Sequence, residues 1–280
     1  MKRLTTVTDF DPRSTPARPD LASQALEGVV RADRYVRPQP AQCVAPAAAV
    51  RAAPDLAAEQ TDQILFGEAF DVLERRDGFA WGQARRDGYV GWVAEEALAS
   101  PVIAPTHRVA ALRAYAFPRP DLKSGPSVLL TMNALVTVEA REGRFARVAR
   151  AGWVGEHQLA DLLAFETDAA GVAERYLGAP YQWGGRESLG LDCSGLVQQA
   201  LFACGRACPR DADMQERELG EAVAAAERRR GDLVFWKDHV AMLLDPERVV
   251  HANGWHMAVA VESLAEAVAR NGEPTVFRRP

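Results

Sequence analysis

Cys193 directly precedes a run of residues with the spacing of an amphipathic helix, a position typical of a reactive thiol. After Cys193 the apolar residues fall at positions 196, 197, 200, 201 and 204, one face of a helix, so the cysteine is expected at or just before the helix N-terminus. The free N–H groups and the helix dipole there stabilise an anion, which predicts a lowered thiol pKa and a site for an oxyanion. The alternative is a buried cysteine that serves as a small apolar residue.

Two histidines could supply the base that a thiol nucleophile needs. His239 opens an apolar run and His251 ends the next one, with a turn at Asp245–Arg248 between them. An antiparallel pair of strands would bring the two rings side by side, so that His239 faces Cys193 and His251 bonds its other ring nitrogen. The remaining histidines lack such a placement: His107, His157 and His256.

From about residue 165 the pattern predicts an α+β arrangement around these residues. Thr167 or Asp168 is expected to cap a helix that runs through Tyr176. Two further helices and three strands are expected, at Ser194–Cys204, near 211–226, and at Asp232–Trp236, Val240–Leu244 and Val249–Ala252.

Ahead of this region the chain alternates with period two and turns at Asp-Gly pairs, which predicts hairpins. Asp77-Gly78 and Asp87-Gly88 punctuate residues 45–100, and Gly91-Trp92-Val93 reappears as Gly152-Trp153-Val154, with the Trp residues 61 positions apart. We interpret this as a duplicated small all-β barrel, and barrels that end in Gly-Trp-Val resemble bacterial SH3-like domains.

The expected organisation is therefore multidomain. Residues 1–44 form an N-terminal arm with one short helix at Asp20–Val30, residues 45–100 a first SH3-like barrel, residues 101–164 a second, and residues 165–280 an α+β catalytic domain.

Five motifs in order make residues 165–280 resemble the NlpC-type (NlpC/p60) cysteine peptidases of bacterial cell-wall metabolism. They are Pro180–Gly185 (PYQWGG), Asp192–Val197 (DCSGLV), Gly231–Trp236 (GDLVFW), His239-Val240 and Val250–Ala252 (VHA). The resemblance implies a papain-like catalytic fold. It also implies that Cys193 is the nucleophile, His239 the base and His251 the third polar residue. Tyr181 is implied as a contributor to the oxyanion site, with a core aromatic as the alternative.

The same resemblance implies a substrate. Members of the family hydrolyse the bond after γ-D-glutamate in peptidoglycan stem peptides, and those with two SH3-like barrels accept peptides whose L-alanine amine is free. A free ammonium needs a negative neighbour. Asp192 is the best candidate, and Glu59 of the first barrel could supply a second carboxylate, although it could also be an ordinary exposed acid. Tyr89 of the first barrel could close the site, with a core residue as the alternative. Ser194 could bind the γ-glutamyl group, whereas Asp211 stands where relatives often carry a small hydroxyl residue.

Composition excludes several other classes. The 280 residues carry a net charge of −5 without a basic stripe, which argues against nucleic acid, and no apolar run is long enough for a membrane span. Four cysteines, including the lone Cys204-x-x-x-Cys208, predict neither a disulfide framework nor a metal site, and no cofactor is expected. The first residues lack the apolar core of a secretory signal, so we expect a cytoplasmic protein. The sequence leaves open whether it is a monomer or an oligomer.

The sequence thus predicts a cysteine peptidase that releases L-Ala-γ-D-Glu from free muropeptides during cell-wall recycling. Two alternatives remain open at this point. One is an amidase or acyltransferase with the same three residues, and the other is a protein that binds cell-wall peptide through its barrels and has a degenerate catalytic domain.

Overall fold

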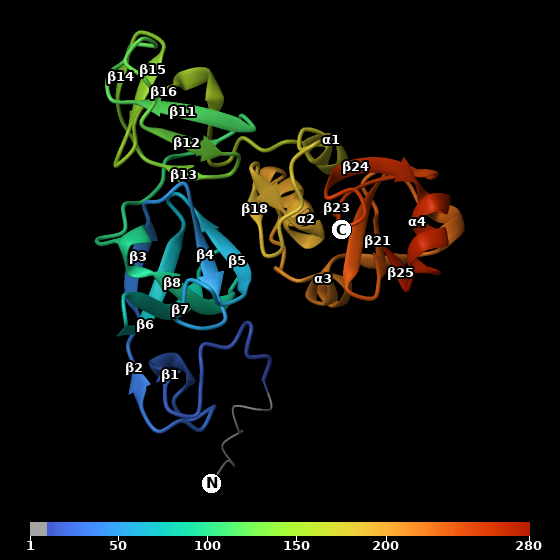
Figure 1. Ribbon diagram of the computed structural model, residues 1–280, viewed down its shortest axis with the longest axis horizontal. Coiled ribbons are helices and arrows are strands. Elements are labelled where there is room, and N and C mark those ends of the chain that lie inside the picture. The colour runs from blue at the N-terminus through green and yellow to red at the C-terminus, as the bar shows by residue number, and fades with distance from the viewer. Residues whose placement is uncertain (1–9) are drawn as a thin grey trace. The chain divides into compact units, whose positions relative to one another are not determined.

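A computed structural model describes residues 10–280, which fall into two compact units divided between Ala104 and Pro105 (Figure 1). Within the described residues, no helix combines the length and the apolarity needed to cross a membrane. The expectation about a secretory signal falls on Met1–Asp9, which lie outside the described residues.

The first unit is built on one antiparallel sheet with the strand order β5-β4-β8-β7-β6-β3-β9. Its strands are β3 (Gln39–Cys43), β4 (Ala47–Arg51), β5 (Gln60–Leu65), β6 (Ala69–Arg76), β7 (Phe79–Ala84), β8 (Val90–Ala94) and β9 (Leu98–Ala99), with the 3₁₀ helix η3 (Glu95–Ala97) before β9. Asp77 and Gly78 both have positive φ, 53° and 78°, as the tight β6–β7 turn requires. The hairpins predicted around the two Asp-Gly pairs are confirmed by the β6–β7 and β7–β8 pairings.

Two expectations for the N-terminal segment are wrong. Asp20–Val30 holds the short strand β1 (Ala22–Ser23), paired with β2 (Tyr35–Val36), and the 3₁₀ turn η2 (Gln24–Leu26) instead of a helix. Of the apolar residues at helical spacing only Leu21 is buried, and Val29 is 47% exposed, so no apolar helix face exists.

The sheet also begins inside the segment expected to be an arm. Strand β3 starts at Gln39 and pairs with β6 and β9. The sequence did not predict this strand because it contains Pro40, and proline has no N–H group to donate to the hydrogen bonds of a β-sheet. Leu21 packs with Trp81 and Trp92 in the core of the sheet, so the preceding segment is part of the unit's structure.

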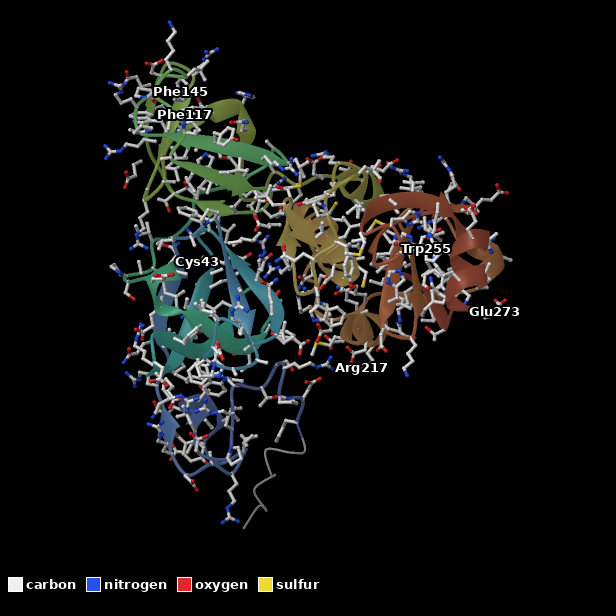
Figure 2. The ribbon with its side chains drawn as sticks, viewed as in Figure 1. Cys43, Phe117, Phe145, Arg217, Trp255 and Glu273 are labelled. Atoms are coloured by element: carbon white, nitrogen blue, oxygen red, sulfur yellow. The ribbon has the colours of Figure 1, made fainter. Side chains whose placement is uncertain are left out.

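In the second unit, residues 105–161 form two small antiparallel sheets with the orders β13-β10-β17 and β12-β11-β16-β15-β14. The strands are β10 (His107–Val109), β11 (Arg113–Phe117), β12 (Val128–Thr131), β13 (Leu135–Val136), β14 (Val138–Glu142), β15 (Phe145–Val148), β16 (Gly152–Gly155) and β17 (Leu159–Asp161), with η4 (Glu156–Gln158) between the last two. Phe117 and Phe145, labelled in Figure 2, pack edge to face with ring centroids 6.2 Å apart. The succession β16–η4–β17 repeats β8–η3–β9 of the first unit.

Residues 165–280 form one six-stranded sheet with helices on both faces. Its strand order is β20-β25-β21-β22-β23-β24. The elements are β20 (Glu221–Val223), β21 (Leu233–Trp236), β22 (His239–Asp245), β23 (Arg248–Asn253), β24 (Ala258–Ser263), β25 (Val276–Arg279), α1 (Ala169–Glu174), α2 (Cys193–Ala203), α3 (Ala212–Glu218), α4 (Leu264–Asn271), η5 (Ala225–Glu227) and the small hairpin β18 (Arg186–Glu187) and β19 (Gly190–Leu191).

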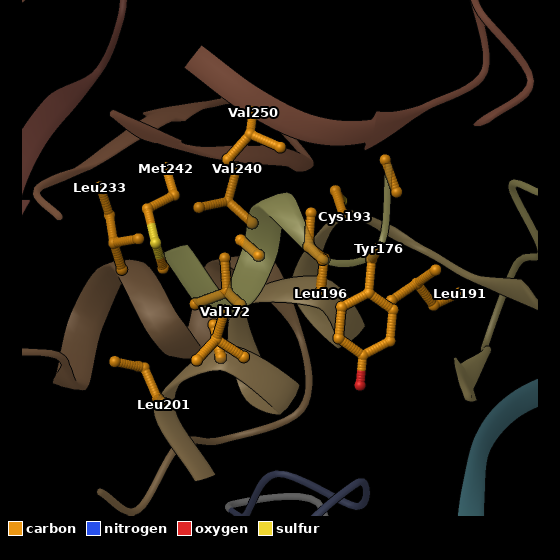
Figure 3. Close-up of a cluster of buried hydrophobic side chains, with 14 of the residues drawn as sticks. Val172, Tyr176, Leu191, Cys193, Leu196, Leu201, Leu233, Val240, Met242 and Val250 are labelled. Carbon is orange, nitrogen blue, oxygen red and sulfur yellow. The ribbon is translucent and has the colours of Figure 1, made fainter. Parts of the chain in front are cut away.

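Alternation along the strands separates the two faces of this sheet. Val240, Met242 and Val250 pack against α1 and α2, and Figure 3 shows them directed toward the side chains of those helices. Leu243 and Val249 are on the other face, which α4 covers through Leu264 and Ala267.

The three predicted strands and the helix at Ser194–Cys204 are confirmed, each within one or two residues. The helix expected near 211–226 is wrong in length, since α3 ends at Glu218 and the chain then forms β20 and η5. Gly220 has φ 54° and turns the chain, so that Glu221–Val223 pair with β25 at the sheet edge.

Side chains join the two parts of the second unit. Asn133 Nδ2 donates to both the carbonyl and the Oε1 of Gln199 in α2, each at 2.9 Å. Met132 belongs to the buried cluster around α2, and Ser188 N–H donates to Thr131 Oγ1 at 3.0 Å. Residues 105–161 are thus anchored on the helix that carries Cys193.

Candidate active site

Asp192 caps the helix that begins with Cys193. Its Oδ1 accepts from Gly195 N–H at 2.8 Å, which satisfies a free donor of the first turn. Its Oδ2 accepts from Gly184 N–H, also at 2.8 Å, and Gly184 has φ 70°, a left-handed conformation that favours glycine. Both Asp192 oxygens also bind the buried guanidinium of Arg210, at 2.7 and 3.0 Å. The carboxylate proposed for the substrate ammonium therefore already anchors the nucleophile's helix.

Cys193 lies at the expected place, 7% exposed. The nearby backbone N–H groups of Val240 and Ser194 favour its thiolate and act to lower its pKa, which places the thiol beside the residue that follows His239. The expected low thiol pKa is wrong for the unliganded protein. Burial, followed by the charge of Asp192, raises the pKa of Cys193 to about 12 and outweighs the N–H groups and Arg210. The resting nucleophile is a neutral thiol.

The two histidines meet as predicted. His239 Nε2 and His251 Nδ1 are 2.8 Å apart, because the antiparallel pairing of β22 and β23 sets both residues on the same face of the sheet. Burial, with the nearby charges of His251 and Arg270, lowers the pKa of His239 to about 3. Burial also lowers the pKa of His251 to about 4. Both rings are neutral at physiological pH, and a neutral ring is what a general base requires.

Sequence reasoning missed a carboxylate behind His251. His251 Nε2 lies 2.7 Å from Glu262 Oε1, and Arg270 Nη2 binds the same oxygen. Glu262 belongs to β24 and Arg270 to α4, two elements that the sequence analysis did not predict. Two signals were present, the alternation Val259-Ala260-Val261-Glu262 and the capping box Ser263-x-x-Glu266 that starts α4.

A second missed residue is Arg210, which is 1% exposed. Besides Asp192 it donates to Ser194 Oγ at 2.8 Å, so the candidate γ-glutamyl ligand Ser194 is held in an ion-pair network. Gln215 of α3 donates to the Ser194 carbonyl at 3.0 Å. Asp211 stands between them at the N-cap of α3 and makes no side-chain capping bond.

Tyr181 is half-buried and packs against the cluster that contains Cys193. Burial, and then the charges of Cys193 and Asp192, raise the pKa of its phenol. The hydroxyl therefore stays protonated and can donate a hydrogen bond near the sulfur. Tyr89 and Glu59 belong to the other unit, where Tyr89 is 5% exposed and Glu59 is exposed.

A cavity of about 370 Å³ adjoins the histidine pair. Its lining includes His239, His251, Trp255 and Arg270, together with Asn253, Gly254 and Asn271. Trp255, labelled in Figure 2, is 73% exposed and lies near Arg270, whose guanidinium carbon is 5.5 Å from the ring centroid. This space borders the ring that would protonate a leaving amine.

The side chains of His251, His256 and Glu262 approach one another within 4.8 Å, a spacing that a metal ion could use. The guanidinium of Arg270 already pairs with that carboxylate, however, and a second cation there would be repelled. We therefore interpret these groups as a hydrogen-bonded chain. The four cysteines are free thiols.

Chemically, the arrangement suits acyl transfer. A thiol at a helix start, a neutral imidazole at the adjacent strand end and an orienting second imidazole are the parts of a nucleophile–base–orienter set. The N–H groups and the protonated Tyr181 hydroxyl offer donors for an oxyanion.

Two family models match the chain. Residues 50–98 match the bacterial dipeptidyl-peptidase SH3 domain, and residues 178–272 match the NlpC/P60 family. A solved NlpC/P60 family protein from Bacillus cereus superposes with a TM-score of 0.73 at 20% identity, covering 86% of this chain and 99% of that one. The fold is therefore that of an NlpC/P60 protein with a mostly-β N-terminal region.

Relatives known by sequence agree with this. Dipeptidyl-peptidase 6 of Lysinibacillus sphaericus is 28% identical over 240 residues, which cover 77% of this chain and 88% of the relative. The γ-D-glutamyl-L-lysine dipeptidyl-peptidase of Bacillus subtilis is 30% identical over 101 residues, about a third of either protein. The chain thus contains an NlpC/P60 domain behind an SH3 domain of the bacterial dipeptidyl-peptidase type, and it is a peptidase.

Proposed function

We propose that the protein hydrolyses the γ-D-glutamyl–diamino acid bond of peptidoglycan stem peptides and releases L-Ala-γ-D-Glu from free peptides. The observation that carries the proposal is the Cys193–His239–His251 arrangement in an NlpC/P60 domain behind a dipeptidyl-peptidase SH3 domain. The names of two relatives, a dipeptidyl-peptidase and a γ-D-glutamyl-L-lysine dipeptidyl-peptidase, support the bond and the product.

In the proposed reaction His239 removes the thiol proton as the sulfur attacks the γ-glutamyl carbonyl. The high pKa of Cys193 and the low pKa of His239 make this transfer part of the chemical step and not a preformed ion pair. His239 then gives the proton to the leaving amine, which breaks the C–N bond and leaves an acyl-enzyme. Water, activated by the same ring, frees L-Ala-γ-D-Glu and the thiol.

Donors at the helix start would stabilise the tetrahedral intermediate. The N–H group of Ser194 and the Tyr181 hydroxyl are our candidates, because each interacts with the sulfur or lies close to it. A Tyr181→Phe variant keeps the ring and removes the donor, so we expect a lower kcat with little change in KM.

For the free L-alanine amine we propose recognition by Asp192 and Glu59, with Tyr89 closing the site. For the γ-glutamyl group we propose Ser194, and Asp211 is a further proposed substrate-binding residue. Asp192 can attract an ammonium only with the charge that Arg210 leaves uncompensated.

We further propose that residues 101–164 are a second SH3-like barrel, a copy of residues 45–100, and that residues 165–280 are the catalytic domain. The repeated succession of strand, 3₁₀ helix and strand after each Gly-Trp-Val supports the duplication. A cytoplasmic role in the recycling of imported peptides completes the proposal, and cell fractionation tests it.

Digestion of matched peptides tests the substrate. The full chain is incubated with L-Ala-γ-D-Glu-diaminopimelate and with the same peptide acetylated at its alanine amine, and products are identified by mass spectrometry. We expect cleavage of the free peptide only. Equal cleavage of both would contradict the recognition of a free amine, and transfer to an added amine in place of hydrolysis would favour an acyltransferase.

A further inference from the structure

We propose that Glu262 is a positioning residue that fixes the protonation pattern of both histidines, with Arg270 holding its carboxylate in place. The set of interacting side chains then has a fourth member behind Cys193, His239 and His251. The kinetic part of this inference rests on the proposed function, whereas its spectroscopic part needs no substrate.

Three of these side chains, those of His239, His251 and Glu262, form a continuous hydrogen-bonded chain on the face of the sheet that α4 covers. His239 Nε2 to His251 Nδ1 is 2.8 Å, and His251 Nε2 to Glu262 Oε1 is 2.7 Å. The pairing of β23 with β24 sets Glu262 opposite Val249, on the same face as His251. His251 is 1% exposed and the Glu262 side chain 7%, so water does not compete for these bonds.

The chemistry of each atom dictates the positions of the protons. An ionised carboxylate only accepts hydrogen bonds, so His251 must carry its proton on Nε2. A neutral His251 then has a lone pair on Nδ1, and this accepts from Nε2–H of His239. The only basic position left on His239 is Nδ1. Without the carboxylate, His251 could carry its proton on Nδ1. His239 would then accept this proton's hydrogen bond at Nε2 and carry its own proton on Nδ1, which would no longer be basic.

Arg270 keeps Glu262 in the accepting role. Its guanidinium binds the same Oε1 that faces His251, and it lies 5.5 Å from the centroid of the Trp255 ring. Because a guanidinium is always charged, this oxygen receives a donor on either side. Glu262 therefore orients the relay rather than taking the proton from it.

The charges around the two histidines mostly oppose their protonation, so the Glu262 carboxylate is needed to stabilise the positive charge that forms during the reaction. The charge of Arg270 disfavours protonation of His239, and the charge of Asp192 favours it. His251 faces Arg270 and His256, which both disfavour its protonation, and Glu262, which favours it. When His239 takes the thiol proton, the Glu262 carboxylate is the negative group directly hydrogen-bonded to the relay.

The decisive experiment compares wild type with Glu262→Gln by ¹⁵N NMR of the imidazoles in the full chain. For wild type we expect Nε2–H tautomers at both His239 and His251. In the variant the amide that replaces the carboxylate can donate to His251 Nε2. We therefore expect that the two histidines no longer occupy the Nε2–H tautomer alone. We also expect kcat for L-Ala-γ-D-Glu-diaminopimelate to fall by about 100-fold or more, with KM within about twofold.

Two further variants separate positioning from folding. Asp232 is 1% exposed and pairs with Arg279 elsewhere in the same sheet, so Asp232→Asn removes a comparable buried charge and should leave the tautomers and kcat unchanged. Glu262→Asp keeps an acceptor-only group and should retain both tautomers and more activity than Glu262→Gln.

Three results would overturn the inference. They are unchanged tautomers in Glu262→Gln, a kcat of that variant within threefold of wild type, and an equal loss of kcat in Asp232→Asn. If wild type fails to cleave the peptide, the proposed function is wrong, but the NMR comparison still decides the role of Glu262.

Discussion

At the scale of single residues, the protonation states of the site are set by burial. A thiol whose pKa is raised to about 12 and an imidazole whose pKa is lowered to about 3 both favour the neutral pair. A cysteine at a helix start is readable from sequence, but its pKa is not. The spacing of Leu196 and Val197 reveals the helix, whereas the enclosure of the sulfur by Val240 and its neighbours exists only in the folded chain.

The lowered histidine pKa values predict how activity depends on pH. A group with a depressed pKa stays unprotonated as pH falls, so His239 remains a competent base below its ordinary value of 6.5. We expect kcat/KM to hold nearly constant from pH 7 to about 5 and to fall only in more acid solution. An initial-rate profile between pH 4 and 8 checks this, and half-loss of activity near pH 6.5 would contradict it.

Arg210 makes a second prediction at this scale. Removing one partner of a buried ion pair leaves an uncompensated charge, so Arg210→Met should lower the free energy of unfolding by about 3–5 kcal/mol. Urea denaturation measures the change. Arg217→Met, which breaks the exposed pair with Asp213, is the matched control and should change stability far less. Equal effects of the two substitutions would show that the Asp192–Arg210 pair does not hold the helix start.

At the scale of elements, the sequence predicted what local chemistry determines. The β6–β7 turn follows from Asp77-Gly78, and the contact of His239 with His251 follows from two apolar runs and one turn. The helix near 211–226 was predicted too long because the alanine-rich stretch has a high helix propensity. In the folded chain its residues Glu221–Val223 pair with β25 instead, and that strand lies more than 50 residues further along the chain. Glu262 was missed for the same kind of reason, since its place beside His251 depends on the β23–β24 register.

Gly220 tests the turn that ends α3. With φ 54°, a side chain at this position is strained, and a Cβ would also run into the backbone carbonyl of Arg279. Gly220→Ala should therefore destabilise the chain by about 1–3 kcal/mol, seen as a lower urea midpoint. Gly254→Ala is the control, because a Cβ there meets nothing within 4 Å. A Gly220→Ala variant as stable as this control would contradict the strained turn.

At the scale of the whole molecule, residues 105–161 are tied to the catalytic region and share its core through Met132. Asn133 is fully buried and bonds Gln199 of α2, so Asn133→Ala should cost about 1–3 kcal/mol by leaving buried polar groups unsatisfied. We expect thermal unfolding of residues 105–280 to remain a single transition that moves to lower temperature. Separate transitions for the two parts would contradict a shared core.

The proposed duplication of the barrel also belongs to the scale of the whole molecule. Gly91-Trp92-Val93 and Gly152-Trp153-Val154 both lead into a 3₁₀ helix and a short strand. The residues around these motifs differ, however, and Asn133, which contacts α2, lies in the proposed second copy. The sequence therefore predicts a repeat, but it does not predict which contacts each proposed copy makes.

The central claim is that Cys193 performs the hydrolysis, and one digest tests it most directly. Wild type, Cys193→Ala and the control Cys204→Ala are incubated with L-Ala-γ-D-Glu-diaminopimelate, and L-Ala-γ-D-Glu is quantified by mass spectrometry. We predict product from wild type and from Cys204→Ala, and none above background from Cys193→Ala. Release of the dipeptide by Cys193→Ala at a rate comparable to wild type would contradict the account.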